Sequence, residues 1–380
     1  MDKSKSTKIS QMTTVHNRTD ARITLKQTAW LSKKRAYQVI LFVQDGQGHE
    51  RDKASGVQII ETGTRPVNRL ARMTFGAWRM WRAVHRAEPE VAHFHDPELI
   101  PVGLALRLSG IKVIYDVHED VPKQILGKFY LPILLRKPVA WAMEAVEWIA
   151  ARCFDAVVPA TPRIAERFPS DKTVVVQNFP ILGELVAQDP VPYIKRPFHF
   201  AYVGGITRAR GVLEMVEAVG QVRGETVTLC LAGVFSPAHL QVETENLPGW
   251  ERVNFHGWAD RRQVANLFSS VRAGLVVLHP TKRYPDAYPV KMFEYMAAGL
   301  PVIASDFPLW REIVEGAGCG LLVDPLDPDA IAGAMQWILD HPAEAEAMGK
   351  RGRKAVEEKY NWEREAKKLI ALYEGLLNKK

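Results

Sequence analysis

Residues 286–306, DAYPVKMFEYMAAGLPVIASD, carry the chemical groups of an anion site at the start of a predicted helix. Pro289 suits the first turn of a helix, because the N–H that proline lacks has no intrahelical partner there. We predict a helix from about Val290 to Ala298, with Gly299 at its C-terminal end. The free N–H groups of its first turn, together with Lys291, would bind an anion such as a phosphate.

The two acids of this stretch, Asp286 and Glu294, suit the sugar parts of a ligand. Glu294 lies about one helical turn beyond Lys291, and a carboxylate there can accept hydrogen bonds from a vicinal diol such as a ribose. Asp286 precedes the helix, in a loop from which it can reach a sugar hydroxyl. The alternative is that Glu294 is only a surface residue, but the apolar side chains on both sides of it argue against an idle acid.

A second anion site is predicted in YVGGITRARGVLEMVEAV, which begins at Tyr202. Gly204 and Gly205 form a tight turn after a strand, and a helix is expected from about Ala209. Arg208 and Arg210 stand at the start of that helix, where guanidinium groups and free N–H groups suit a phosphate. The alternative is a glycine turn with solvated arginines. The dinucleotide fingerprint Gly-x-Gly-x-x-Gly is absent here.

Three strand-to-helix corners in the first half carry further candidates, because the carboxyl ends of parallel strands share one edge of a sheet. A His/Asp cluster of this kind could hold a metal ion, but the sequence has no D-x-D motif and no histidine pair at helical spacing, so we expect no metal. The alternative for His95 and Asp96 is simple helix capping. The acceptor-side candidates are His16, Asp20 and Arg22 at the first corner and His95, Asp96 and Glu98 at the second; the third corner offers His118, Glu119 and Asp120.

These motifs lie on a chain that alternates strand-like and helix-like stretches, which is typical of βαβ units with parallel sheets. The first half has apolar β-branched runs at residues 37, 57, 112, 155 and 173, with helical periodicity at 67–87 and 136–153. A proline-rich stretch, 189–199, separates it from a second half with the same pattern. We therefore predict an α/β protein of two doubly wound domains, residues 1–190 and 191–361.

The length of the chain supports two domains, because 380 residues are too many for one hydrophobic core. No run reaches the ~20 apolar residues of a membrane span, and MDKSKSTKIS has no apolar signal-peptide segment. Cys153, Cys230 and Cys319 follow no disulfide or metal spacing, so we expect buried free thiols in a cytoplasmic protein.

The positive charge is confined to the first half. Residues 1–190 hold 27 Lys and Arg against 20 Asp and Glu, whereas the rest of the chain holds 23 of each. Two segments of that half, 69–86 and 123–148, mix basic and aromatic residues, which suits an anionic membrane surface. The alternative is helices that pack on a sheet and leave a solvated basic face; it is favoured for 69–86, and surface contact for 123–148. We expect no nucleic-acid partner.

The stretch at 286–306 resembles the donor-binding motif of retaining glycosyltransferases of family 4, which have the GT-B fold: an acid, seven residues, Glu, then AxGxPVIAS. The segments YVGGITRARG, VNFHGWAD, GCGLLVDPLDPDAIAGAM and YNWEREAKKLIALYEGLL resemble the same family. The resemblance implies two Rossmann-like domains across a cleft, with a last helix, 362–380, that returns to the N-terminal domain. HxxxDxRI and HFHDPE resemble a subgroup of surface-polysaccharide enzymes.

The resemblance also implies roles for residues. Glu294 would bind the nucleotide ribose and Arg210 the diphosphate. From the anion-site argument above, Arg208, Lys291 and the N–H of Val290 would stabilise the same diphosphate. Asp286 and His118 would orient the donor sugar, and Gly257, in FHGW, would lie at the base. The implied reaction is metal-free sugar transfer with retention, without a cofactor, from a UDP or GDP sugar to a glycan or lipid-linked acceptor.

Two positions depart from the family pattern. The family usually has Glu at the position of Asp286 and often has Arg at the position of Gly205. These departures keep open a catalytically silent GT-B subunit that binds a partner or glycan. A sugar-nucleotide epimerase on the same fold is the third hypothesis, and product formed without an acceptor would distinguish it.

Overall fold

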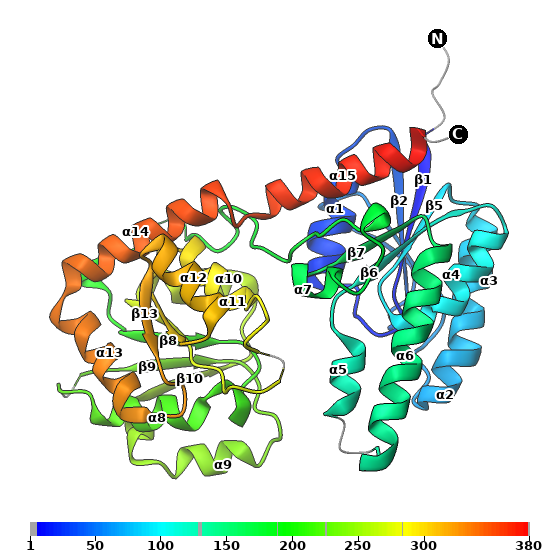
Figure 1. Cartoon of the computed structure of the whole chain (residues 1–380). Helices are drawn as coiled ribbons and strands as arrows, with labels where there is room; N and C mark the ends of the chain where they lie inside the picture. Colours follow the sequence, from blue (N-terminus) through cyan, green and yellow to red (C-terminus); the bar gives the residue numbers. More distant parts are fainter. Residues whose placement is uncertain (1–5, 128–130, 188, 225, 283, 379–380) are drawn as a thin grey trace. The chain divides into compact units, whose positions relative to one another are not determined.

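A computed structural model of the protein describes residues 6–127, 131–187, 189–224, 226–282 and 284–378 (Figure 1). It forms two compact units, Met1–Asn178 with Arg364–Lys380, and Phe179–Glu363. The boundary predicted at 190/191 therefore falls later in the sequence than the division at Asn178. Segment 179–187 goes with the second unit because Phe179 and Leu185 are buried in its core.

The sheet of the first unit has seven strands in the order β3-β4-β2-β1-β5-β6-β7. All neighbouring strands are parallel except the short β3, which pairs antiparallel with β4. The buried strands are nearly continuous apolar runs, as expected where helices cover both faces of a sheet. The strands are β1 (Thr7–Met12), β2 (Tyr37–Val43), β3 (Glu50–Arg51), β4 (Gln58–Glu61), β5 (Val91–Phe94), β6 (Lys112–Val117) and β7 (Ala156–Pro159).

Helices connect these strands and cover the sheet. The last helix, α15, packs with this unit from Arg364 onward, as the predicted return of the C-terminal helix requires. Its Tyr373 is fully buried. The helices are the helical segment Ala21–Thr28 followed by α1 (Ala29–Ser32), α2 (Arg69–Ala71), the helical turn Arg72–Gly76, α3 (Ala77–Ala87), the turn Pro97–Leu99, α4 (Ile100–Leu108), α5 (Val121–Leu126), α6 (Ile133–Cys153), α7 (Pro162–Ala165), the turn Ser170–Lys172 and α15 (Trp362–Asn378).

The second unit has a six-stranded sheet, all parallel, in the order β10-β9-β8-β11-β12-β13. From β8 the chain first adds β9 and β10 on one side and then β11, β12 and β13 on the other side. Ligands of open α/β folds bind at such a switch point, which here lies between β8 and β11. The strands are β8 (Phe200–Val203), β9 (Leu229–Ala232), β10 (Val253–Gly257), β11 (Ala273–Val276), β12 (Val302–Ser305) and β13 (Gly320–Val323).

Helices and short helical turns complete the second unit. Both faces of its sheet are buried under apolar clusters that include Tyr202, Met215 and Ile331 on one side and Phe293, Tyr295 and Trp310 on the other. The elements are the turns Tyr193–Lys195, Arg208–Arg210 and Pro248–Arg252, and the helices α8 (Val212–Gln221), α9 (Leu240–Glu245), α10 (Arg261–Ser270), α11 (Val290–Ala297), α12 (Pro308–Ala317), α13 (Pro328–Asp340) and α14 (Pro342–Glu358).

The predicted fold class, an α/β protein of two doubly wound units, is confirmed, and three local predictions are wrong. The run at 173 is no strand: Val174 and Val176 only donate backbone hydrogen bonds to β7. The helix expected from Ala209 begins at Val212, because Gly211 interrupts it with a φ of 73°. Cys153 is exposed, unlike the other two cysteines. No helix in the described ranges is long and apolar enough to span a membrane.

Candidate functional site

The predicted residues of the first unit gather at the carboxyl edge of its sheet, where the loop after β1 is held by two acids. Asp96, which follows β5, accepts hydrogen bonds from the Thr13 hydroxyl at 2.8 Å and the Thr14 N–H at 2.6 Å. Glu98 pairs with Arg72 at 2.7 Å and accepts from the Thr14 hydroxyl at 2.5 Å. The capping hypothesis for Asp96 is wrong, because its side chain makes no hydrogen bond with the following helical turn.

His16 and Asp20 lie in the same loop and contact one another. His16 Nδ1 is 3.2 Å from Asp20, and its Nε2 is 3.5 Å from Asp96. Asp20 also caps the helical segment that follows, by accepting from the N–H groups of Arg22 and Ile23. Burial alone would lower the pKa of His16, but the hydrogen bond to Asp20 and the charge of Asp96 raise it above its usual value.

The centre of this site is Asp116, a fully buried acid on β6 that the sequence analysis did not select. Its carboxylate lies 3.0 Å from the Arg22 guanidinium and 3.1 Å from His118 Nε2, and it accepts a hydrogen bond from the Gln27 amide. Burial alone would raise the pKa of Asp116, but the charge of Arg22 holds it well below its usual value. Asp116 is therefore an ionised acid that fixes Arg22 and His118.

Hydrogen bonds set the tautomer of the histidines around Asp116. His95 Nε2 lies 2.5 Å from the Gln11 carbonyl oxygen, so it donates and leaves Nδ1 as an acceptor. His118 Nε2 is 3.1 Å from that Nδ1, so it carries a proton directed at His95 and Asp116. The Tyr373 hydroxyl, from α15, lies 2.8 Å from His93 Nδ1 and extends the network.

His93 and His95 stay neutral in this network. Burial lowers the pKa of His93, and burial together with the neighbouring His93 lowers that of His95 well below its usual value. His93, His95 and Asp116 have ligand atoms within 4.8 Å of one another, close enough for a shared metal ion. However, the Arg22 guanidinium already bonds both oxygens of Asp116, at 3.0 and 3.2 Å, and its positive charge would repel a cation.

In the second unit, the turn at Gly204 and Gly205 meets the start of α11. Arg210 donates to the Gly205 carbonyl at 2.9 Å, and Lys291 lies against Tyr202, with 2.6 Å between Nζ and the hydroxyl. A Cβ at Gly204 would lie 3.2 Å from Lys291 Nζ, so the amino group is next to the turn. Burial, and then the charge of Arg210, lower the pKa of Lys291 well below its usual value.

Glu294, the predicted ribose ligand, is paired with a residue that the sequence analysis missed. Arg261, at the start of α10, lies 2.7 Å from Glu294 and 2.8 Å from Glu184. The pairing leaves room for a diol only if Glu294 shares its oxygens between Arg261 and the ligand, which a carboxylate with two oxygens can do. Although burial opposes it, the contacts with Glu184 and Glu294 raise the pKa of Arg261.

The structure places the other predicted donor residues as follows. Pro289 is buried before α11, whose first residue is Val290, as predicted. Asp286 is exposed in the loop before it. Gly257 ends β10 with a φ of 65°, and its carbonyl accepts from the Gly233 N–H at 2.6 Å. Arg208, however, pairs at the surface with Glu243.

The missed residues left only weak signals in the sequence. Asp116 interrupts the apolar run KVIYDV, and a charged residue inside a buried strand is unusual unless it is paired. Its partner Gln27, and the residues Gln11 and Tyr373 that bond the neighbouring His95 and His93, come from distant parts of the chain, so no local pattern marks them. Arg261 is an ordinary basic residue after a helix cap, and only its contacts distinguish it.

Comparison with known proteins gives this geometry a context. A model of the glycosyl transferase 4-like domain matches residues 21–178, and the model Glycosyl transferases group 1 matches residues 189–355. The chain is 24% identical to the D-rhamnosyltransferase WbpZ of Pseudomonas aeruginosa over 277 residues, 70% of this chain and 68% of that one. It is 24% identical to a phosphatidyl-myo-inositol mannosyltransferase of Mycobacterium leprae over 309 residues, 75% and 73% of the two chains.

Solved structures share the fold along almost the whole chain. A sucrose-phosphate synthase from Thermosynechococcus elongatus superimposes with a TM-score of 0.75 at 20% identity and covers 98% of this chain and 100% of its own. HepE from Anabaena, solved in complex with UDP-glucose, superimposes with a TM-score of 0.72 at 14% identity, with 97% and 99% covered. By the two family models and this fold, the chain belongs to the glycosyl transferases group 1, with the GT-B fold.

Proposed function

We propose that this glycosyltransferase moves a sugar from a nucleotide-diphosphate donor to a glycan or lipid-linked acceptor, with retention at the anomeric carbon and without a metal. The observation that carries the donor assignment is the placing of Arg210 and Lys291 at the Gly204–Gly205 turn, where a bound anion would favour the charged form of Lys291. The hydrogen bonds of Arg210 and Lys291 among the described residues go to carbonyl and hydroxyl oxygens. A diphosphate would supply the negative charge that this pair lacks.

In the proposed reaction the bond between the sugar and the diphosphate breaks, and the leaving diphosphate gains negative charge. Arg210, Lys291 and the first N–H groups of α11 would stabilise that charge as it develops. Glu294 would hold the ribose, and Asp286 and His118 would orient the sugar. The sequence shows no carboxylate suited to form a covalent glycosyl-enzyme. We therefore favour attack by an acceptor hydroxyl on the face that the diphosphate leaves, so that the new bond to the anomeric carbon forms as the bond to the diphosphate breaks.

A thermal-shift panel of UDP and GDP sugars tests the donor assignment, because a ligand that binds only the folded state raises the melting temperature. We expect one donor to raise the melting temperature of the wild type, and Glu294→Ala to remove the shift. Glu312→Ala, which changes an exposed acid of the same unit, is the matched control. A Glu294→Ala variant with the full shift would overturn the donor site. Binding without transfer to any acceptor would favour the silent-subunit hypothesis, and product without an acceptor the epimerase.

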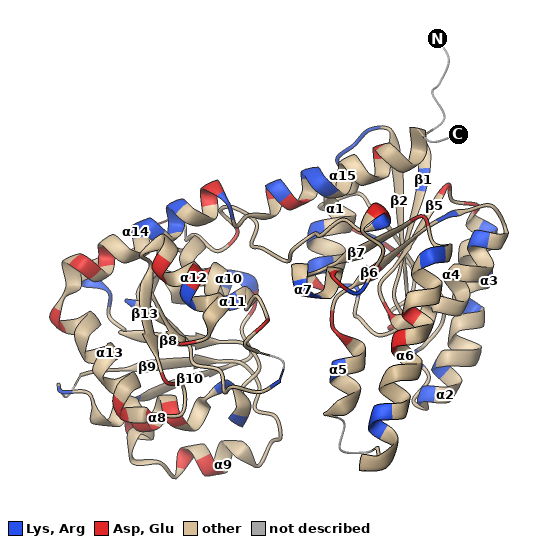
Figure 2. Cartoon of the chain, viewed as in Figure 1, with Lys and Arg blue, Asp and Glu red and all other residues tan. Residues whose placement is uncertain are grey.

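We also propose that the first unit docks on the inner face of an anionic membrane, where a lipid-linked acceptor would be found. Exposed apolar side chains cluster at the start of α6: Ile133, Leu134 and Leu135 are 74%, 84% and 51% exposed. Arg136 and Lys137 follow directly, and Figure 2 shows further basic residues along α3. The other basic residues of the predicted surface are Lys123 and Lys128, of which Lys128 lies outside the described residues.

The segment 69–86 packs on the sheet and also leaves apolar side chains exposed, which supports the proposed docking. Ala77, Met80 and Val84 are buried against the sheet, while Leu70 and Phe75 are 72% and 55% exposed. Each basic residue near an anionic leaflet contributes about 1 kcal/mol of attraction, which salt screens.

Co-sedimentation with vesicles tests the docking proposal. We expect wild type to bind vesicles with anionic lipid at low salt, and the variant Ile133→Ser, Leu134→Ser, Leu135→Ser to lose that binding. Leu108→Ser, at a leucine that is 90% exposed at the end of α4, is the control. Equal binding by the triple variant, or none by wild type, would contradict the proposal.

A further inference from the structure

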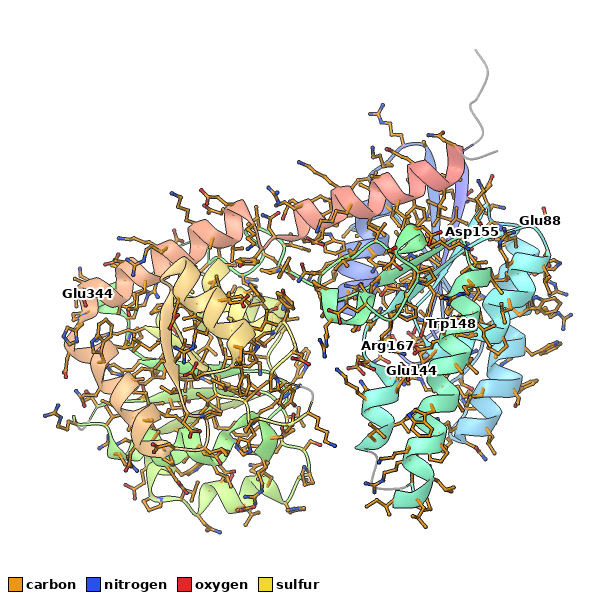
Figure 3. All side chains as sticks on the ribbon, in the orientation of Figure 1. Glu88, Glu144, Trp148, Asp155, Arg167 and Glu344 are labelled. Carbon is orange, nitrogen blue, oxygen red and sulfur yellow. The ribbon has the colours of Figure 1, made fainter. Side chains whose placement is uncertain are left out.

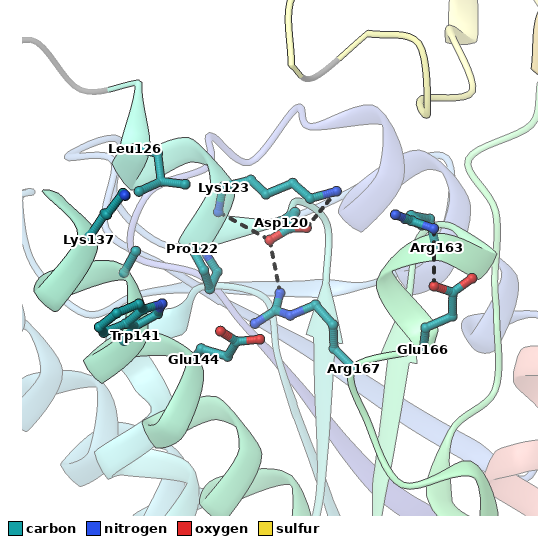
Figure 4. A pocket seen from close by; sticks show the side chains of 11 residues that line it. Asp120, Pro122, Lys123, Leu126, Lys137, Trp141, Glu144, Arg163, Glu166 and Arg167 are labelled. Atoms are coloured by element: carbon teal, nitrogen blue, oxygen red, sulfur yellow. Dashed lines mark hydrogen bonds and ion pairs between the residues drawn. The ribbon is translucent and has the colours of Figure 1, made fainter.

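The first unit contains a cavity that the donor and histidine sites do not use. It has a volume of about 430 Å³ and lies among α5, α6 and α7 (Figure 4), within the range of about 300–1,000 Å³ that is usual for small-ligand sites. Asp120, in its wall, follows His118 by two residues at the carboxyl end of β6. The cavity therefore adjoins the same sheet edge as the histidine network.

Ion pairs neutralise most of the charge in the walls. Glu147, which is buried and pairs with Arg167, also accepts a hydrogen bond from the Tyr115 hydroxyl at 2.8 Å. This second bond holds the Glu147 carboxylate in position for Arg167. Cations that are already paired have less attraction left for a phosphate. The pairs join Arg167 to Asp120 (3.2 Å) and to Glu147 (2.5 Å), Lys123 to Asp120 (3.5 Å) and Arg163 to Glu166 (3.5 Å).

The wall formed by α6 is different, because its described charged side chains are not neutralised by ion pairs and can bond a ligand. Lys137, Trp141 and Glu144 recur at helical spacing and line the cavity together. Within the described ranges Lys137 and Glu144 make no ion pair or hydrogen bond, and Trp141 is 69% exposed. Figure 4 shows the Trp141 ring on the same side of the cavity as Lys137, and Glu144 below it.

We infer that this cavity is a saccharide subsite, which takes one ring of a neutral glycan acceptor. The apolar face of a sugar ring can lie on the Trp141 indole, as an aromatic face favours flat apolar contact. Lys137 donates hydrogen bonds and Glu144 accepts them, and a ring with several hydroxyls needs both. A phosphate would need an excess of free cations, whereas the described residues of this wall offer one free cation, Lys137, and one free acid, Glu144.

The inference rests on the proposed function, since it assigns the acceptor of that same transferase. At 3.6 residues per turn, Ile133 and Leu134 of the proposed membrane surface fall on the same side of α6 as Lys137 and Trp141, so a saccharide in the cavity would lie next to that surface.

The test is saturation-transfer NMR on the full chain with methyl α-glycosides of glucose, galactose, mannose and rhamnose, and separately with inorganic phosphate. We expect at least one glycoside to bind, and Trp141→Ala and Glu144→Gln each to weaken that binding about five- to tenfold. Trp148→Ala is the matched control, because Trp148 lies on the same helix one turn beyond Glu144 (Figure 3), stacks on Arg152 at 3.2 Å and does not line the cavity.

Titration of each variant with the donor identified by the thermal-shift panel separates this inference from the proposed function, because the donor site lies in the other unit. If no nucleotide sugar binds, the proposed function fails. If the donor binds normally, any one of three results overturns the saccharide subsite: no glycoside binds, Trp141→Ala binds as well as wild type, or phosphate alone binds and is lost in Lys137→Gln.

Discussion

The two candidate sites hold their charges in different ways. In the first unit, Asp116 is fully buried, and Arg22 and His118 bond it directly. In the second, Arg210 and Lys291 rest against carbonyl and hydroxyl oxygens. A buried charge with charged partners holds its side chains in one position. A basic side chain beside neutral groups has no anionic partner, so it can still bind an anionic ligand. The first arrangement suits a frame that positions His118, and the second suits a receptor for a diphosphate.

The largest effect should come from breaking the buried frame. Asp116→Asn removes the negative charge beside Arg22, and we expect the free energy of unfolding to fall by about 3–5 kcal/mol, because Arg22 is left buried and uncompensated. Asp286→Asn, in an exposed loop of the other site, should change it by less than about 0.5 kcal/mol. Chemical denaturation measures both. Similar losses in the two variants would remove the distinction between the sites.

A substitution in the second site should act on the reaction and spare the fold. We expect Arg210→Ala to lower the transfer rate about 10²–10³-fold, the usual cost of losing one donor to a developing negative charge. Arg208→Ala should cost less than about tenfold, because Arg208 pairs with Glu243. Steady-state kinetics with the donor identified by the thermal-shift panel measures both, with circular dichroism as the check on folding. If the Arg208 variant is the weaker enzyme, the assignment of the diphosphate contact is wrong.

Mild acid should weaken the first unit. The folded-state pKa values of His93 and His95 are lowered, so below about pH 6.5 the unfolded chain binds more protons and the folded state loses stability as pH falls. His16, whose pKa is raised, acts in the opposite direction. We expect the melting temperature to fall between pH 6.5 and 5, and less steeply in His95→Gln.

Calorimetry at a series of pH values checks this expectation. His239→Gln, at an exposed histidine of the second unit, should leave the slope of wild type unchanged. A melting temperature that rises toward pH 5 would mean that His16 outweighs the buried pair.

The smallest expected effect is that of chelation. The charge of the leaving group is assigned to Arg210 and Lys291, and Arg22 lies where a metal would bind Asp116. Activity should therefore be the same, within error, with and without EDTA. Complete loss in EDTA that Mg²⁺ or Mn²⁺ reverses would show that the charges of at least one site have been misassigned.

Local patterns in the sequence were enough for the elements and for part of the second site. The run YQVILFV forms β2, and the order Pro289, α11, Gly299 follows the capping preferences of a helix. Strand formation and helix capping depend on residues that are close in the sequence. The position of Lys291 and Glu294 on one short helix has the same local origin. The same local view failed at Arg208 and Arg210, where the left-handed Gly211 separates the turn from α8.

By itself, then, the sequence determined two α/β units, the helix that carries Lys291 and Glu294, and the sheet edge at which His16, His95 and His118 meet. Only the tertiary structure decided which charges neutralise which: Asp116 with Arg22, Glu294 with Arg261, and Arg167 with Glu147. The reason is physical. Secondary structure follows periodicity over a few residues, whereas the partner of a buried charge is chosen by packing between segments far apart in the chain.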